Sequence, residues 1–140
     1  MRQDQRSTCP ISTALELVGD RWTLLVIRDL VFAGKRRFRE FLQSEEAIST
    51  NVLSDRLRAL MERGILRRDD DPTHAQKAVY SLTEKGLDLL PLLVAMSAWT
   101  QKHDPSTRRP EAVQLLQGGP RLLKQLEQQL RQSHGIASAA

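Results

Sequence analysis

The stretch from Ile48 to Leu66 constrains the fold most, because it reads as an amphipathic helix with a defined start and stop. Ser49 is a good N-cap, since its hydroxyl can accept a hydrogen bond from a free amide of the first turn. Leu53, Leu57 and Leu60 recur at helical spacing and form one apolar face. Gly64 supplies the left-handed residue that ends many helices.

The opposite face of this helix is polar and rich in hydrogen-bond donors and acceptors. It carries Asn51, Asp55, Arg58 and Glu62, flanked by Thr50 and Ser54. A helix that enters the DNA major groove reads base edges with such side chains near its N-terminus. An ordinary amphipathic surface helix shows the same pattern, so this stretch alone leaves both interpretations open.

The composition is that of a globular chain with one domain. Of 140 residues, 40% are hydrophobic and 27% are charged, which is enough apolar material to bury a core. No apolar run approaches the roughly 20 residues of a membrane span. The polar N-terminus lacks the apolar segment of a signal peptide, so we expect a cytoplasmic protein without membrane contact.

The charges are sorted along the chain rather than spread evenly. The formal net charge is +4, but residues 1–104 hold 16 Lys and Arg against 15 Asp and Glu. Basic residues gather at 35–39 and 56–68, and acidic ones at 45–46 and 69–71. Local basic patches on a nearly neutral domain favour an anionic partner such as double-stranded DNA.

Cys9 is the only cysteine, so no disulfide can form within the chain. With three scattered histidines beside it, His74, His103 and His134, we predict no metal site, and no cofactor is expected.

Before the organising helix, residues 1–8 are predicted to be disordered and three helices follow. The first begins at Pro10 and ends at Gly19, and the second covers Arg21 to Phe32 with Asp20 as its N-cap. The second is apolar nearly all round, which predicts burial at the centre of the domain. A basic turn at 35–37 then leads into a short third helix from Phe38 to Leu42.

After Gly64 the pattern changes to that of a β-hairpin. Residues 65–69 and 77–82 alternate as strands around a loop that contains Pro72. Thr83 then caps a predicted long helix from Glu84 to about Lys102, with Pro91 as a kink. Its apolar surface is wider than one small domain can cover, which predicts a partner subunit.

We divide the chain into a domain at 9–104 and an extension at 105–140. The extension contains a linker, a short helix at 111–117 and an amphipathic helix at 121–132, after which residues 133–140 should fray. We expect the leucine stripe of the last helix to pack on a partner subunit rather than on its own domain. The fold class is therefore mainly α with a small β-hairpin: a winged helix-turn-helix with a C-terminal helical extension.

In its ordered motifs, the chain resembles the HxlR family of bacterial transcriptional regulators over about residues 9–103. The motifs that carry the resemblance are Cys9-Pro10-Ile11, Ala14-Leu15, Gly19-Asp20-Arg21-Trp22-Thr23, Arg37-Phe38-Arg39-Glu40-Phe41, Ile48 to Leu57, Gly64-Ile65-Leu66-Arg67-Arg68 and Tyr80 to Gly86. The resemblance implies a homodimer on a roughly palindromic operator. It also implies that some members sense oxidants or electrophiles through the cysteine that matches Cys9, so an oxidant or small molecule is a candidate inducer.

Dimer contacts in this family come from the N-terminal segment and the helix after the wing. The predicted dimerisation residues on these two segments are Ile11, Leu15, Leu89, Leu93, Met96 and Trp99.

Two features depart from the family pattern. The wing carries Asp69, Asp70 and Asp71, and acids close to phosphate repel it. We therefore expect the wing to meet DNA only through its tip or far strand, near His74, Gln76 and Lys77. The extension at 105–140 goes beyond the usual end of the family, so the resemblance implies no role for it.

The leading hypothesis is a sequence-specific DNA-binding regulator. Asn51 suits adenine and Arg58 suits guanine, while Ser49, Thr50 and Ser54 can serve bases or phosphate. The residues expected to hold the backbone are Arg36, Arg37, Arg56 and Lys77. The alternative is a winged-helix module that binds protein without specific DNA binding. We find no nucleophile–base pair or phosphate loop, and do not expect an enzyme.

Overall fold

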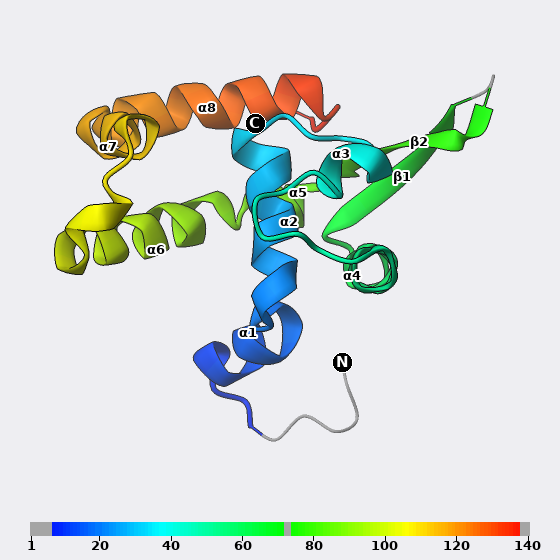
Figure 1. Cartoon of the computed structure of the whole chain (residues 1–140), viewed down its shortest axis with the longest axis horizontal. Helices are drawn as coiled ribbons and strands as arrows, with labels where there is room; N and C mark the ends of the chain where they lie inside the picture. The colour runs from blue at the N-terminus through cyan, green and yellow to red at the C-terminus, as the bar shows by residue number, and fades with distance from the viewer. Residues whose placement is uncertain (1–6, 72–73, 138–140) are drawn as a thin grey trace.

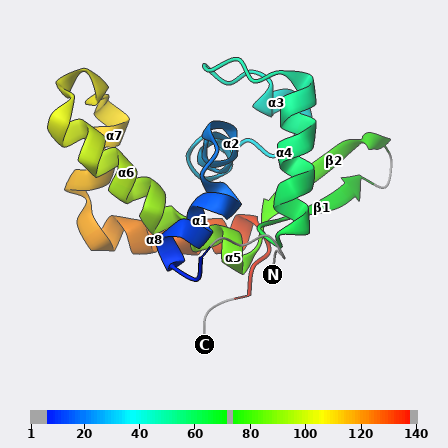
Figure 2. The ribbon, with the colours of Figure 1, turned by 90° about the horizontal axis from the view of Figure 1, so that it is seen from below.

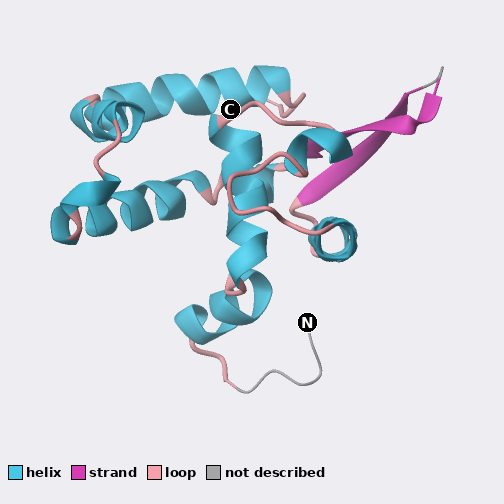
Figure 3. Cartoon of the chain, viewed as in Figure 1, coloured by secondary structure: helices cyan, strands magenta, loops and turns pink. Residues whose placement is uncertain are grey.

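The computed structural model describes residues 7–71 and 74–137 and confirms a mainly helical chain with one two-stranded hairpin (Figures 1 and 3). The predicted disorder of residues 1–8 falls mostly on residues 1–6, which lie outside the described part. The elements are α1 (Pro10–Val18), α2 (Arg21–Phe32), α3 (Phe38–Phe41), α4 (Thr50–Glu62), β1 (Leu66–Asp71), β2 (His74–Leu82), α5 (Glu84–Leu87), α6 (Leu90–His103), the 3₁₀ turn η1 (Pro105–Thr107), α7 (Pro110–Gln117) and α8 (Gly119–Ser133).

Helix α2 lies at the centre of the molecule, as its apolar composition predicted. Val26, Ile27 and Leu30 are almost fully buried. The Asp20 carboxylate caps the helix by accepting hydrogen bonds from the backbone amides of Trp22 and Thr23, both at 3.2 Å. Figures 1 and 2 show α6 and α7 on one side of α2 and α4 and the hairpin on the other, while α8 runs past α2 from the α7 side toward the base of the hairpin.

Helix α4 follows the start and stop signals read from the sequence. The Ser49 hydroxyl accepts a hydrogen bond from the Val52 amide at 3.2 Å. Leu53, Leu57 and Leu60 are buried against the core. Gly64 has a φ of 73°, a left-handed conformation that glycine adopts without strain, and it directs the chain into β1.

The hairpin extends away from the end of α4 as the predicted wing (Figure 2). It is antiparallel, with Leu66 opposite Leu82 and Asp69 opposite Val79. The base of the hairpin is anchored in the core, because Leu66 and Leu82 are buried. Ala78 and Tyr80 of β2 are buried as well, so contact with the core continues beyond the base.

The helix predicted from Glu84 to Lys102 is not continuous: it forms two helices, α5 and α6. Pro91 occupies the first turn of α6, where its missing amide costs no hydrogen bond. Within one long helix the proline ring would clash with the carbonyl four residues earlier, at Leu87. Residue Leu87 is where α5 ends.

The extension packs on its own domain, contrary to the prediction that its stripe covers a partner subunit. Leu130 of α8 is part of the buried core, and Leu126 packs against that core. The Arg131 guanidinium makes two hydrogen bonds of 2.6 Å to the Glu84 carboxylate at the start of α5. Helix α8 is therefore tied to the segment that follows the wing.

The end of α8 holds the base of the wing, where the sequence predicted a frayed terminus. His134 is 2% exposed, and its Nδ1 accepts a hydrogen bond from the Leu82 amide at 2.9 Å. Arg67 of β1 donates to the His134 carbonyl. Burial, together with the nearby positive charges of Arg36 and Arg67, lowers the pKa of His134 from its usual 6.5 to about 4.

Within the part of the chain that the structure describes, no helix is long and apolar enough to cross a membrane.

We predict that acid releases this C-terminal contact. Unfolded His134 takes up a proton near its usual pKa of 6.5 but folded His134 only near 4, so its contribution to stability is lost as pH falls through this window. The free energy of unfolding should drop by roughly 3 kcal/mol more between pH 7 and pH 4 than in a His134→Asn variant, whose amide oxygen can still accept from Leu82. Chemical denaturation at several pH values measures the difference. Identical pH profiles for the two proteins would contradict the assignment.

Candidate nucleic-acid interface

The polar face of α4 is open to solvent from its first residue onward. Its exposed members are Ser49, Thr50, Asn51, Ser54, Asp55 and Arg58. The same helix buries its leucines on the other side, so its orientation in the domain matches the amphipathic pattern. A row of short polar side chains at a free helix N-terminus is what base reading in a major groove requires.

Asp55 joins two arginines at the middle of this face, a role that the sequence interpretation missed. One carboxylate oxygen lies 2.6 Å from the Arg56 guanidinium and the other 2.7 Å from that of Arg58. Asp55 and Arg58 are three residues apart on one helix, so this pair could have been predicted from the sequence. Asp55 therefore restrains the arginine expected to contact guanine.

Arg56 also connects α4 to the centre of the fold. Its Nε lies 2.7 Å from the Asp20 carboxylate, the group that caps α2. Although burial opposes it, hydrogen bonds from Thr23 and Arg56 hold the pKa of Asp20 below its ordinary value. The structure thus uses Arg56, predicted as a phosphate contact, to orient α4 against α2.

Arg36 was also predicted to contact phosphate, but its guanidinium is turned into the molecule. It donates to the Tyr80 carbonyl at 2.8 Å, to the Ser81 hydroxyl at 2.5 Å and to the Ser133 carbonyl at 3.0 Å. These bonds join the basic turn, the wing and the end of α8. We therefore correct its role to a structural one.

Arg37 and Lys77 remain exposed, and the structure brings them together. The Arg37 guanidinium donates to the Lys77 carbonyl at 2.8 Å, which places the start of α3 beside β2 of the wing. Both side chains can extend toward a phosphate backbone from this edge. Contact of these two side chains with the phosphate backbone stays a prediction.

The acidic residues of the wing are partly neutralised by neighbours on the same strand. Asp69 lies 3.3 Å from the Arg67 guanidinium, and Asp70 lies 3.0 Å from that of Arg68. The side chains of Asp71, His74 and Gln76 lie outside the described part of the structure. The pairing reduces the repulsion that the sequence predicted between this strand and DNA.

The predicted dimerisation residues fall into two groups. Ile11, Leu15, Met96 and Trp99 are 73%, 63%, 46% and 68% exposed, an unusual state for large apolar side chains. Leu93 instead lies in the core of its own chain and Leu89 packs against that core, so the structure assigns both to intramolecular packing. Leu92, 40% exposed, was not predicted and adds to the open face of α6.

Cys9 is exposed and stands at the N-cap of α1. Hydrogen bonds from the backbone amides of Ser12 and Ile11 lower the pKa of its thiol, because a helix N-terminus stabilises the thiolate. Among the described residues, no group of three His, Cys, Asp or Glu side chains could hold a metal ion.

The helix-turn-helix of α3 and α4, with the exposed polar face of α4, is followed directly by the hairpin, and this order defines the class: a winged helix-turn-helix protein. A model described as HxlR-like helix-turn-helix matches residues 17–108. The chain therefore belongs to the HxlR-like family, which is one of transcriptional regulators and not of enzymes.

Relatives of known sequence or structure agree with this assignment. The HTH-type regulator sll1512 of Synechocystis is 40% identical over 88 residues, 63% of this chain and 64% of the relative, so the chain spans less than two thirds of that relative's length. The reduced form of YodB from Bacillus subtilis is 34% identical with a TM-score of 0.57, covering 69% of this chain and 94% of YodB. The oxidized redox regulator HypR is 32% identical with a TM-score of 0.60, covering 67% and 96%. YodB has also been solved with quinone bound and after diamide treatment.

We predict that Arg36→Ala lowers the free energy of unfolding by about 2 kcal/mol, because it leaves partly buried acceptors on the wing and on α8 unpaired. The matched control is Arg39→Ala, an exposed arginine two residues from the same basic turn, which should cost less than about 0.5 kcal/mol. Urea denaturation measures both. Equal losses would mean that the Arg36 contacts do not hold the wing.

Proposed function

We propose that the protein is a sequence-specific transcriptional regulator that binds a roughly palindromic operator as a homodimer. The observation that carries the proposal is the exposed polar face of α4 beside the basic edge of the wing. Family membership supports it, because the relatives are named as transcriptional regulators.

In this proposal α4 enters the major groove with its N-terminal turns foremost. Asn51 pairs with adenine and Arg58 with guanine, each through two hydrogen bonds. Ser49, Thr50 and Ser54 contact bases or phosphates around them. Asp55 holds the Arg58 guanidinium in place in the free protein. When DNA binds, the base replaces Asp55 as the hydrogen-bond partner of Arg58.

The phosphate contacts come from the edge where α3 meets the wing. Arg37 and Lys77 neutralise backbone charge on both sides of the groove, and Lys77 belongs to the far strand. Arg36 and Arg56 act indirectly, since they fix the wing and α4 in position.

The homodimer forms through the exposed apolar residues of α1 and α6. The exposed apolar surface consists of Ile11 and Leu15 on α1 and Met96 and Trp99 on α6. Contact of this surface with water is unfavourable, and a second subunit would bury it. A two-fold axis through this surface presents two copies of α4 to successive turns of DNA.

Cys9 supports a second function, the sensing of oxidants or electrophiles. Its exposed thiol has a lowered pKa, and the solved relatives include a quinone-bound regulator and one named as a redox regulator. A two-electron oxidant removes two electrons and two protons from two thiols. The product is a disulfide between subunits or a mixed disulfide with a small thiol.

The competing function is a winged-helix module that binds protein. Such a module would keep the dimer surface but would have no use for Arg37, Lys77 and the polar face of α4. Salt dependence separates the two, because each phosphate contact releases counterions when it forms.

We predict that Arg58→Ala weakens specific DNA binding by about 1–3 kcal/mol and relaxes preference at one base position in each half-site. Arg37→Ala should weaken binding to DNA of all sequences about equally. It should also reduce the slope of log affinity against log salt concentration by about one per subunit. Fluorescence anisotropy with duplexes of selected and scrambled sequence, over a series of salt concentrations, measures both effects.

The control for charge is Arg121→Ala on α8, which removes a positive charge outside the proposed interface. It should leave both the sequence preference and the salt dependence of DNA binding unchanged. Unchanged affinity and preference in Arg58→Ala would place the reading face elsewhere. Salt-independent binding would instead favour the protein-interaction module.

A further prediction concerns the reactivity of the thiol. Alkylation of Cys9 by iodoacetamide should reach half its maximal rate at a lower pH in the folded protein than in the same chain unfolded in urea, because only the folded chain has the helix N-terminus. Diamide should change DNA affinity in the native protein and leave Cys9→Ser unaffected. Coincident pH profiles, or equal diamide responses, would make Cys9 a passive surface residue.

A further inference from the structure

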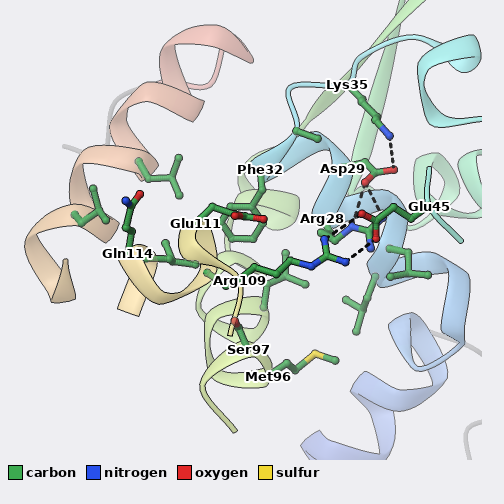
Figure 4. A pocket seen from close by; sticks show the side chains of 18 of the residues that line it. Arg28, Asp29, Phe32, Lys35, Glu45, Met96, Ser97, Arg109, Glu111 and Gln114 are labelled. Carbon is green, nitrogen blue, oxygen red and sulfur yellow. Dashed lines mark hydrogen bonds and ion pairs between the residues drawn. The ribbon is translucent and has the colours of Figure 1, made fainter. Parts of the chain in front are cut away.

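A cavity of about 760 Å³ lies between α2, α6, α7 and α8 (Figure 4). Each of the four helices supplies apolar side chains to its wall. These are Leu24, Leu25, Phe32, Leu93, Met96, Ala112, Leu115, Leu122 and Leu126. A volume of this size falls within the range of pockets that bind small organic molecules.

Nearly half of the lining residues come from the C-terminal extension. The family model ends at residue 108, whereas α7 and α8 follow it. The leucines of α8 therefore have two roles. Leu130 completes the core, while Leu122 and Leu126 face the cavity.

One large apolar side chain stays exposed where it borders the cavity. Phe32 is 43% exposed. An aromatic ring in contact with water forgoes the stabilisation that burial would give. An apolar molecule in the cavity would cover it.

The three cations of the rim each lie beside a carboxylate, and Glu111 adds a further acid to the lining. Arg28 lies 2.7 Å from Glu46 and 2.8 Å from Asp29, Lys35 lies 3.5 Å from Asp29, and Arg109 lies 2.8 Å from Glu45. Figure 4 shows the pairs of Asp29 with Arg28 and Lys35, and of Glu45 with Arg109, along one side of the cavity. Because every one of these cations already has a carboxylate, the rim offers little to a charged ligand. Uncharged groups remain for hydrogen bonding in Ser97 and the amides of Gln114 and Gln125.

The rim also includes the turn that leads into α4. Gln43 and Glu45 line the cavity and lie between α3 and the N-cap Ser49. Arg109, the N-cap residue of α7, holds Glu45 from the other side. An occupant of the cavity would therefore touch the segment that positions the DNA-reading helix.

We propose that this cavity binds a neutral, largely apolar organic molecule, and that occupancy changes DNA affinity through the Gln43–Glu45 turn. The second part rests on the proposed function, whereas the binding itself does not. This effector site is separate from Cys9 and requires no covalent chemistry.

The neutral dye Nile red tests the binding with the full chain in the absence of DNA. Its fluorescence should rise saturably, with about one dye per chain, and the anionic dye anilinonaphthalene sulfonate should bind at least about tenfold more weakly. Gln125→Trp fills the cavity from α8 and Gln114→Trp fills it from α7, so each should reduce Nile red affinity by at least about tenfold. The matched controls are Gln128→Trp and Gln117→Trp, exposed glutamines on the same helices that do not line the cavity.

Three results would overturn the binding. These are equal affinity in the filled and control variants, tighter binding of the anionic dye, and dye affinity that falls as the chain self-associates, which would mean that a second copy fills the cavity.

Gel shifts with saturating Nile red test the coupling, with an expected change in DNA affinity of at least about threefold in the native chain and none in Gln125→Trp. Unchanged affinity in the native chain would overturn the coupling. A chain that binds no DNA even without dye would refute the proposed function and leave the dye titration to decide the cavity.

Discussion

The burial of α2 is the constraint on which the rest of the structure depends. Its apolar residues point in almost every direction, so helices must pack on it from both sides. Helix α4 covers one side and α6 the other. The ion pair from Asp20 at the start of α2 to Arg56 then fixes the angle of α4. The same side chain therefore caps the central helix and orients the helix that presents the polar face.

The sequence predicted the parts of the fold that local signals determine. The caps at Asp20 and Ser49 and the left-handed Gly64 mark helix ends through interactions within a few residues, and all were read correctly. The position of α8 depends on contacts such as His134 with Leu82, 52 residues apart, which no periodicity encodes. The exposed face of α4 was predictable because exposure follows from helical spacing in the sequence. The partners of Arg36 and Arg56 were not predictable, because partners follow from tertiary packing.

Electrostatics in this protein are mostly local, and that explains why net charge was a weak guide. Acidic residues pair with arginines at the wing, at the cavity rim and on α4, so few charges act at long range. The exposed cations at Arg37 and Lys77 gain importance from this pairing. They stand where the basic turn meets β2 of the wing, and the extension supports the wing through Arg36 and His134.

The central claim is that two copies of α4, held apart by a dimer of α1 and α6, read two half-sites on DNA. Selection of binding sites from a pool of random duplexes with the purified full chain tests it most directly. The account predicts an inverted repeat whose half-site centres lie about 10 base pairs, or a multiple of that, apart. A pool without enrichment, or one enriched for a single unrepeated motif, would contradict it.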